Sequence, residues 1–190
     1  MSLVPSPSQT VGPFFSLGLA MESPGGCLAS PCGKSERLKL ICTIFDGDAV
    51  PVNDAMIEVW QANDEGKYNH PEDAQQKSTD PRFKGFGRLH SDENGVCIFE
   101  TIKPGRVPGW DDTFQAPHLN LSVFARGILK RLATRVYFAD DPANAEDPVL
   151  ALVPEGRRDT LMAHADPQES AVWRFEIHLC GDHETVFFDC

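Results

Sequence analysis

The stretch Leu38-Lys39-Leu40-Ile41-Cys42-Thr43-Ile44-Phe45 is a short apolar run that ends at the turn signal Asp46-Gly47-Asp48. Similar apolar runs, each closed by a turn, recur along the rest of the chain, as is typical of strands. In such turns glycine supplies positive φ angles, and Asp or Asn bonds its own backbone. The spacing favours an antiparallel sandwich over strand–helix–strand units. We therefore expect an all-β fold with an antiparallel β-sandwich core and long loops.

The pattern predicts individual elements as well. Candidate strands cover residues 38–45, 55–62, 96–101, 119–125, 134–138, 173–179 and 185–188, and residues 86–89 form a possible further strand. Two segments favour short helices, at 142–152 and 157–163; Asp141 is placed to cap the first of them, with Pro142 in its first turn. The polar residues 71–84 indicate a long surface loop.

The N-terminal part differs in composition from the rest. With 190 residues the chain is long enough for one domain with a well-buried core. Residues 1–34 combine a start rich in Pro and Ser with a second stretch rich in Pro and Gly, which cannot bury apolar area alone. We expect 1–34 to be an extended arm and loop that contacts a partner subunit, and 35–190 to be the β-sandwich domain.

The charge of the chain excludes several functions. Seventeen basic and 28 acidic residues give a net charge of -11, which repels nucleic acid and anionic membrane surfaces. An anionic small substrate would need a local basic group to override this field. The six cysteines form no Cys-x-x-Cys pair, and neither a leader nor a membrane-spanning apolar run is visible. We expect reduced thiols and a cytoplasmic location.

Common catalytic motifs are missing from the sequence. It contains no phosphate-binding glycine loop, no Gly-x-Ser-x-Gly and no His-Glu-x-x-His, which argues against the commonest NTPases, hydrolases and zinc proteases. The segment Asp92-Glu93-Asn94-Gly95 is similar to the start of a calcium loop but lacks its ligand spacing and its closing Glu, so a hairpin turn is the better interpretation.

Six segments in a fixed order carry a more specific signal. They are Ser8-Gln9-Thr10-Val11-Gly12-Pro13-Phe14, Ile57-Glu58-Val59-Trp60-Gln61-Ala62 with Gly66-Lys67-Tyr68, Ala116-Pro117-His118-Leu119-Asn120, Phe124-Ala125-Arg126-Gly127, Thr134-Arg135-Val136-Tyr137-Phe138 and Glu184-Thr185-Val186-Phe187-Phe188-Asp189. Together they resemble the intradiol dioxygenase family, from about residue 8 to the C-terminus. Within that family the chain is most similar to the metal-free α subunit of members built from two kinds of chain.

The resemblance implies a β-sandwich and a hetero-oligomer of α and β subunits. It implies cleavage of the catechol carboxylate 3,4-dihydroxybenzoate by O₂ to 3-carboxy-cis,cis-muconate, a step of aromatic catabolism in the β-ketoadipate pathway. The chemistry of the family needs Fe(III) held by two tyrosines and two histidines. Phenolates are hard anionic donors that suit ferric iron, and a His-x-His pair on a strand directs both imidazoles to one face.

The ligand set is broken in this chain. Tyr68 and His118 stand at two of the family's ligand positions, but Asn120 replaces the second histidine, and its neutral amide is a poor ferric ligand. The segment 104–110, which carries the other tyrosine in catalytic chains, has none. The resemblance therefore places Fe(III) in an iron-binding β subunit and predicts no catalytic residue and no metal in this chain.

The resemblance also implies a substrate-binding role for three residues. Arg126 lies in an intact Phe-Ala-Arg-Gly segment, whose arginine faces the partner's pocket and meets the substrate carboxylate. A guanidinium stays charged and offers a planar fork to a carboxylate. The same resemblance puts the backbone of Gly12 and Pro13 at the wall of that pocket.

Other interpretations of these residues stay open. Tyr68 next to a turn is usually a rim aromatic, His118 an ordinary strand histidine and Arg126 a partner in a surface ion pair. Gly12 and Pro13 would then be a simple chain bend. Two rival functions follow: a stand-alone catechol-type dioxygenase that uses Tyr68, His118 and further ligands, and a non-enzymatic β-sandwich binding module of transthyretin-like type.

Overall fold

The computed structural model describes residues 6–12, 15, 18–19, 26–28 and 37–189. Across residues 37–189 the chain forms ten strands and three short 3₁₀ helices. In these described parts, no helix is long and apolar enough to cross a membrane. The elements are β1 (Arg37–Phe45), β2 (Met56–Gln61), β3 (Phe86–His90), β4 (Val96–Ile102), β5 (Val107–Pro108), β6 (Phe114–Gln115), β7 (His118–Phe124), β8 (Leu132–Phe138), η1 (Pro142–Glu146), η2 (Leu150–Leu152), η3 (Glu155–Leu161), β9 (Met162–Ala165) and β10 (Val172–His178).

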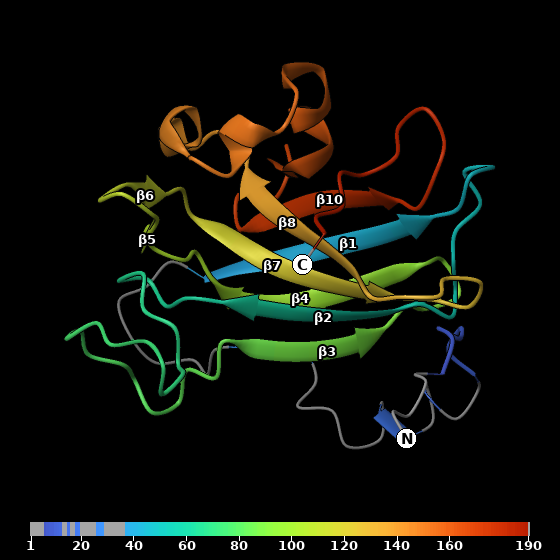
Figure 1. Cartoon of the computed structure of the whole chain (residues 1–190), viewed down its shortest axis with the longest axis horizontal. Coiled ribbons are helices and arrows are strands. Elements are labelled where there is room, and N and C mark those ends of the chain that lie inside the picture. Colours follow the sequence, from blue (N-terminus) through green and yellow to red (C-terminus); the bar gives the residue numbers. More distant parts are fainter. Residues whose placement is uncertain (1–5, 13–14, 16–17, 20–25, 29–36, 190) are drawn as a thin grey trace, which may run out of the picture.

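Eight of the strands form one sheet in the order β3-β2-β7-β8-β9-β10-β1-β4. The sheet folds over at β9, so that β2, β7 and β8 face β10, β1 and β4 across the core, with the 3₁₀ helices gathered beside β8 and β10 (Figure 1). The predicted all-β sandwich is confirmed. Its pairing is mostly antiparallel as expected, but β1 with β10 and β8 with β9 are parallel pairs.

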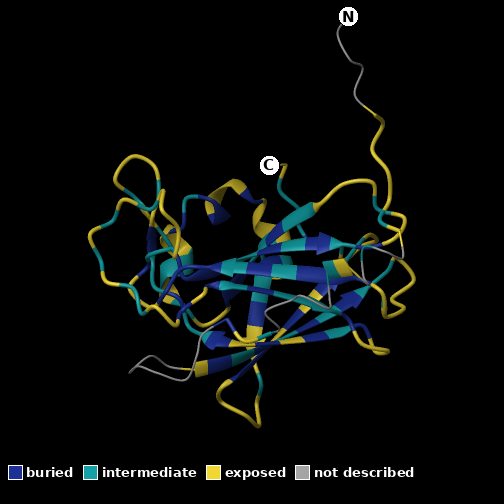
Figure 2. Cartoon of the chain, turned by 90° about the horizontal axis from the view of Figure 1, so that it is seen from below, coloured by how far each residue is buried: buried dark blue, intermediate teal, exposed yellow. Residues whose placement is uncertain are grey.

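The strands form where apolar and polar residues alternate. In β1, Leu38, Leu40, Cys42 and Ile44 are at most 5% exposed, and the residues between them face outward. Because side chains alternate between the faces of a strand, this pattern gives the sheet one face for the core. Burying one such leucine contributes about 1.5–3 kcal/mol. Figure 2 shows buried residues running along the strands and exposed residues gathered in the loops.

The predicted helices are present only in part. Asp141 does cap the first: its carboxylate accepts a hydrogen bond from the Ala143 amide at 3.0 Å, with Pro142 at the start. The segment 142–152 is nevertheless two 3₁₀ helices, since the Asp147 carboxylate holds the Val149 and Leu150 amides between them.

The predicted helix at 157–163 also ends early. The 3₁₀ helix η3 stops at Leu161, and Met162 and Ala163 join β9 because they pair with Tyr137 and Phe138 of β8. The predicted strand at 185–188 is wrong: only Phe188 forms a bridge, to Ala133, and the Thr185 hydroxyl instead accepts a hydrogen bond from the His178 amide. The short hairpin of β5 and β6 has no counterpart among the predicted strands.

Part of the predicted arm is built into the sandwich. Leu28 is fully buried in the core. Its amide donates to the Glu100 carbonyl at 2.9 Å, and its carbonyl accepts from the Lys84 amide at 3.1 Å. The segment 1–34 thus supplies a core side chain in addition to its exposed residues 6–10.

A buried polar bridge joins the two halves of the sandwich. Gln61 at the end of β2 is fully buried, and its carbonyl oxygen accepts a 2.6 Å hydrogen bond from the Thr101 hydroxyl on β4. Its amide donates to the carbonyls of Ala62 and Ile102 at 3.0 and 3.1 Å. Every polar atom of this side chain is therefore satisfied, as burial requires.

We expect Gln61→Leu to lower the free energy of unfolding by about 1–3 kcal/mol, because it removes the hydrogen-bond partner of the buried Thr101 hydroxyl and the donor to the Ala62 and Ile102 carbonyls. Thr101→Val removes a single bond and is expected to cost about 1 kcal/mol. Urea unfolding measures both through the midpoint at an unchanged slope. A loss for Gln61→Leu no larger than that for Thr101→Val would contradict the role of the bridge.

Candidate functional site

The outer face of β2, β7 and β8 carries the candidate ligand residues. His118 and Asn120 are two apart on β7 and point outward, opposite to the core residue Leu119. Strand register places Trp60 of β2 and Arg135 of β8 on either side of Asn120. Neighbouring strands lie about 5 Å apart, so these outward side chains meet in one place.

A turn after β2 brings Tyr68 to the same place. The predicted turn at Asn63-Asp64-Glu65-Gly66 is confirmed: the Asn63 side chain accepts from the Glu65 and Lys67 amides at 3.1 and 2.8 Å. Gly66 has a φ of 78°, and a Cβ there would collide with the Arg106 carbonyl. The turn thus requires glycine.

The ring of Tyr68 lies flat against Trp60. The two rings stack with centroids 5.8 Å apart and an interplanar angle of 8°. The Asp73 carboxylate accepts from the Tyr68 amide at 2.8 Å and fixes the loop behind it. The phenol is therefore held over the sheet rather than turned to solvent.

The three predicted ligand positions form one cluster. The Asn120 amide donates to the Tyr68 hydroxyl at 3.1 Å, and the His118 Nε2 lies 3.5 Å from the same oxygen. The His118 Nδ1 is 2.7 Å from the Ala116 carbonyl, which orients the ring. The structure thus brings together the three residues that the sequence singled out, Tyr68, His118 and Asn120.

Burial keeps the cluster uncharged. His118 is 2% exposed, and burial, reinforced by the positive charge of Arg135, lowers its pKa to about 4. Burial also raises the pKa of Tyr68, although the Asn120 hydrogen bond and the charge of Arg135 act in the opposite direction. At neutral pH the cluster therefore contains a neutral imidazole, a neutral phenol and an amide.

These residues do not fit a ferric ion. A metal ligand must present a lone pair, yet Asn120 directs the donor end of its amide at the Tyr68 oxygen. The segment 104–110 contributes Pro108 and no phenol to the neighbouring groove, which measures about 610 Å³ and is also lined by Trp60, Tyr68 and His70. Two donors are too few for a ferric site.

Arg135 and Tyr137 lie directly beside this cluster and were not predicted as site residues. Arg135 Nη1 donates to the Gln115 side chain at 2.6 Å and to the Tyr137 hydroxyl at 3.3 Å. The Tyr137 hydroxyl in turn donates to Asp147 at 3.3 Å. The sequence did contain a signal for these two residues. Side chains alternate between the faces of a strand, and residues 134–138 were already a predicted strand, so Arg135 and Tyr137 share one of its faces.

Arg126 lies at the other end of β7. Its side chain is 75% exposed, and its guanidinium forms an ion pair with the Asp54 carboxylate at 2.7 Å. His118 and Phe124 stand at opposite ends of β7, which at about 3.3 Å per residue spans about 20 Å. Arg126 therefore cannot reach the Tyr68 cluster of its own chain.

The N-terminal segment meets the Arg126 end of β7. The Thr10 hydroxyl accepts a 2.7 Å hydrogen bond from the Gly127 amide, and the Phe15 ring lies 5.4 Å from that of Phe124. Gly12 stands between these two contacts, and its carbonyl accepts from the Phe15 amide at 3.0 Å. Pro13 lies outside the described residues. The structure thus places Gly12 and Arg126 near the same end of β7.

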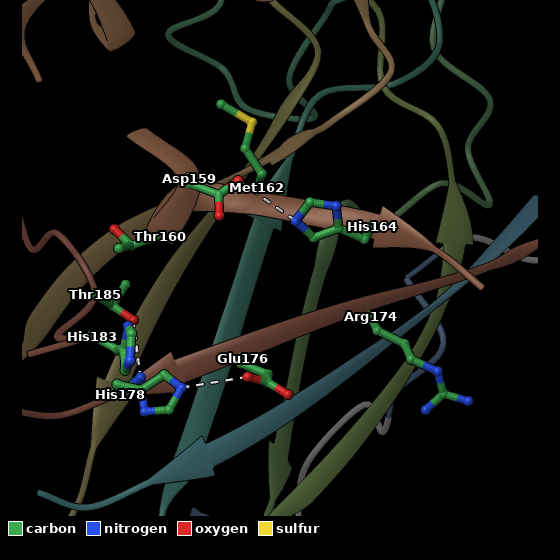
Figure 3. A pocket seen from close by; sticks show the side chains of 9 residues that line it. All are labelled: Asp159, Thr160, Met162, His164, Arg174, Glu176, His178, His183 and Thr185. Carbon is green, nitrogen blue, oxygen red and sulfur yellow. Dashed lines mark hydrogen bonds and ion pairs between the residues drawn. The ribbon is translucent and has the colours of Figure 1, made fainter. Parts of the chain in front are cut away.

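A second pocket of about 510 Å³ lies between β9, β10 and η3 and contains three histidines (Figure 3). His178 contacts Glu176 at 3.4 Å, and His164 contacts Asp159 at 3.8 Å, so both imidazoles face a carboxylate of their own. Across the described residues, no three His, Cys, Asp or Glu side chains are placed to share a metal ion. This pocket offers no chemistry comparable to that of the β7 face.

The chain is similar to known dioxygenase chains. The model of the family described as Dioxygenase matches residues 12–181. The chain is 41% identical to the protocatechuate 3,4-dioxygenase alpha chain of Burkholderia cepacia, over 99% of this chain and 98% of the relative. It is 39% identical to the alpha chain of Pseudomonas putida, over 97% and 96%. Identity to the beta chain of Burkholderia cepacia is 37%, over 79% of this chain and 67% of that one.

Solved structures share the fold. An intradiol ring-cleavage dioxygenase from Tetranychus urticae superposes with a TM-score of 0.65 at 20% identity, over 95% of this chain and 97% of that one. Catechol 1,2-dioxygenase from an Acinetobacter species gives 0.60 at 25% identity, over 80% and 55%. The resemblance carried by the six sequence segments is confirmed. This chain belongs to the intradiol dioxygenase family.

Proposed function

We propose that this chain is the α subunit of a protocatechuate 3,4-dioxygenase, an enzyme that cleaves 3,4-dihydroxybenzoate with O₂ to 3-carboxy-cis,cis-muconate. Fe(III) belongs to a β-type partner subunit, and this chain completes the substrate pocket there. The observation that carries the proposal is the hydrogen bond from the Asn120 amide to the Tyr68 hydroxyl, which puts an amide donor where a ferric site needs a ligand. The chain that contains it matches α chains along nearly its whole length.

The part played by this chain is to bind and orient the substrate. Because β7 separates Arg126 from the Tyr68 cluster by about 20 Å, the guanidinium acts on a pocket of a neighbouring chain. Its ion pair with Asp54 is exposed, and such pairs contribute about 0–1 kcal/mol. A substrate carboxylate that arrives in a pocket closed to water competes well with that partner. Gly12 and Pro13 form the adjoining wall.

Co-expression with a candidate β-type chain tests the proposal. The two chains are expected to co-purify, with iron and oxygen uptake on protocatechuate found in the complex, whereas this chain alone is colourless and inactive. About one equivalent of iron in the isolated chain, with a visible tyrosinate-to-iron band, would favour the stand-alone dioxygenase. A partner whose activity is indifferent to this chain would favour the binding module.

Arg126→Ala is expected to lower kcat/KM for protocatechuate in the reassembled complex, mostly through KM. A charge-assisted hydrogen bond contributes about 1.5–3 kcal/mol, which corresponds to roughly 10- to 150-fold. Catechol, which lacks the carboxylate, is expected to remain as poor a substrate as before. Arg126→Lys recovers part of the loss, because an ammonium does not reproduce the planar fork.

Steady-state oxygen uptake with both substrates makes this measurement. Arg82→Ala is the matched control, since Arg82 is also exposed and paired with a nearby carboxylate, that of Asp80. Equal effects of Arg126→Ala on both substrates, or none on either, would remove Arg126 from the substrate site.

The N-terminal segment is proposed to act at the subunit interface. Thr10→Val removes the hydroxyl that accepts from Gly127, and a neutral hydrogen bond contributes about 0.5–1.5 kcal/mol. We therefore expect the subunit dissociation constant to rise by roughly two- to tenfold, as measured by analytical ultracentrifugation. Deletion of residues 1–13 is expected to weaken assembly further, whereas Ser8→Ala in the same segment serves as control. Unchanged assembly in the deletion would rule out this role.

A further inference from the structure

Asp54 and Arg126 face each other where the paired strands β2 and β7 run out. Met56 of β2 pairs with Phe124 of β7, and the same register continued by two residues sets Asp54 opposite Arg126. The Asp54 carboxylate lies 2.7 Å from the Arg126 guanidinium. The contact therefore follows the register of two paired strands, and the backbones on both sides of it are held by the sheet.

The segment that carries Asp54 is anchored to the core through Ser91, which is 7% exposed. The Ser91 hydroxyl accepts from the Ala55 amide at 3.0 Å and donates to the Val52 carbonyl at 2.8 Å. The Ser91 amide donates to the Ala55 carbonyl at 2.9 Å. Asp54 lies between these two anchored residues, so its short side chain projects from a fixed backbone.

The side chain of Arg126 depends more on its partner. The turn around it is held, since the Ile128 amide donates to the Ala125 carbonyl at 3.3 Å and the Gly127 amide donates to Thr10. The arginine side chain itself is 75% exposed. In the part of the chain that the structure describes, Asp54 is its one ion-pair partner. Without this contact, a long side chain with high rotamer entropy would be left to move in solvent.

Asp54 approaches the guanidinium at Nε. The two Nη groups at the outer end of the planar fork are then left for a second anion. A guanidinium has five N–H donors, so a ligand carboxylate at the Nη groups and Asp54 at Nε can bind at the same time. A substrate that draws on the charge of Arg126 thus does not have to displace Asp54.

We propose that Asp54 is a positioning residue that holds the Arg126 fork ready for the substrate carboxylate. This inference rests on the proposed function, which assigns Arg126 to the substrate pocket of a partner subunit, and adds to it a residue that does not touch the substrate. Because the ion pair orders the guanidinium in advance, less entropy is lost when the substrate binds. Ordering one such side chain corresponds to roughly two- to tenfold in affinity.

The test measures oxygen uptake by the reassembled complex with protocatechuate and with catechol. We expect Asp54→Ala to raise KM for protocatechuate by roughly two- to tenfold, with kcat nearly unchanged and catechol unaffected. Asp54→Asn recovers part of the loss, because its amide oxygen still accepts from the guanidinium. The dissociation constant of 4-hydroxybenzoate, which has the carboxylate but only one hydroxyl, rises by the same factor in a calorimetric titration.

A double variant and a control complete the design. Asp54→Ala combined with Arg126→Ala is expected to lose no more than Arg126→Ala alone, because Asp54 acts only through Arg126. Asp80→Ala is the control: its carboxylate is similarly exposed, 34% against 38% for Asp54, and is also paired with an arginine. This control should leave KM for both substrates unchanged.

A lower KM for protocatechuate in Asp54→Ala would show that Asp54 merely competes with the substrate for the arginine, and would overturn the inference. An equal rise of KM for catechol, or additive losses in the double variant, would overturn it as well. If Arg126→Ala affects neither substrate, the proposed role of Arg126 fails. If Arg126→Ala raises KM for protocatechuate and Asp54→Ala does not, only the role of Asp54 fails.

Discussion

Strand β7 alternates between the two faces of the sheet, and this alternation organises both the core and the site. Leu119, Leu121 and Val123 point inward and are at most 2% exposed, while His118 and Asn120 point outward at one end of the strand. A slip of one residue against β2 or β8 would exchange the two sets. The pairing that stabilises the sandwich therefore also fixes which side chains meet on its surface.

The same strand sets the distance between two functional regions. The Tyr68 cluster lies near the start of β7, and the Thr10–Gly127 contact lies just beyond its end. A rigid, doubly paired strand keeps these regions apart, so they cannot act on one small molecule in a single chain. Under the proposed function this separation explains why the two kinds of subunit depend on each other: one holds the metal, and the other supplies charge and backbone to its pocket.

Local charge matters more than net charge in this molecule. The chain carries -11 overall, yet each region of interest contains an arginine, Arg135 beside the cluster and Arg126 at the far end. Interactions between exposed charges more than about 8–10 Å apart are largely screened at physiological salt, so a nearby charge outweighs the net charge of the chain at the surface. The proposed attraction of a substrate carboxylate by Arg126 depends on this effect.

What the sequence determined by itself is the fold class, the main strands and the inventory of chemistry. Alternating apolar runs specify strands because burial follows period two, and the resemblance to the family is enough to show that Asn120 stands where a second histidine is expected. Segments with weak local patterns were misjudged: residues 162–165 form a strand because β8 and β10 offer them backbone partners, and residues 185–188 stay irregular beside them. Only the tertiary structure decided that Tyr68, His118 and Asn120 lie together, that Arg135 is the cross-strand neighbour of Asn120 and that Arg126 is far away. These contacts and separations involve segments that are far apart in the sequence. Strand pairing fixes the distances between such segments, whereas composition and residue spacing do not determine them.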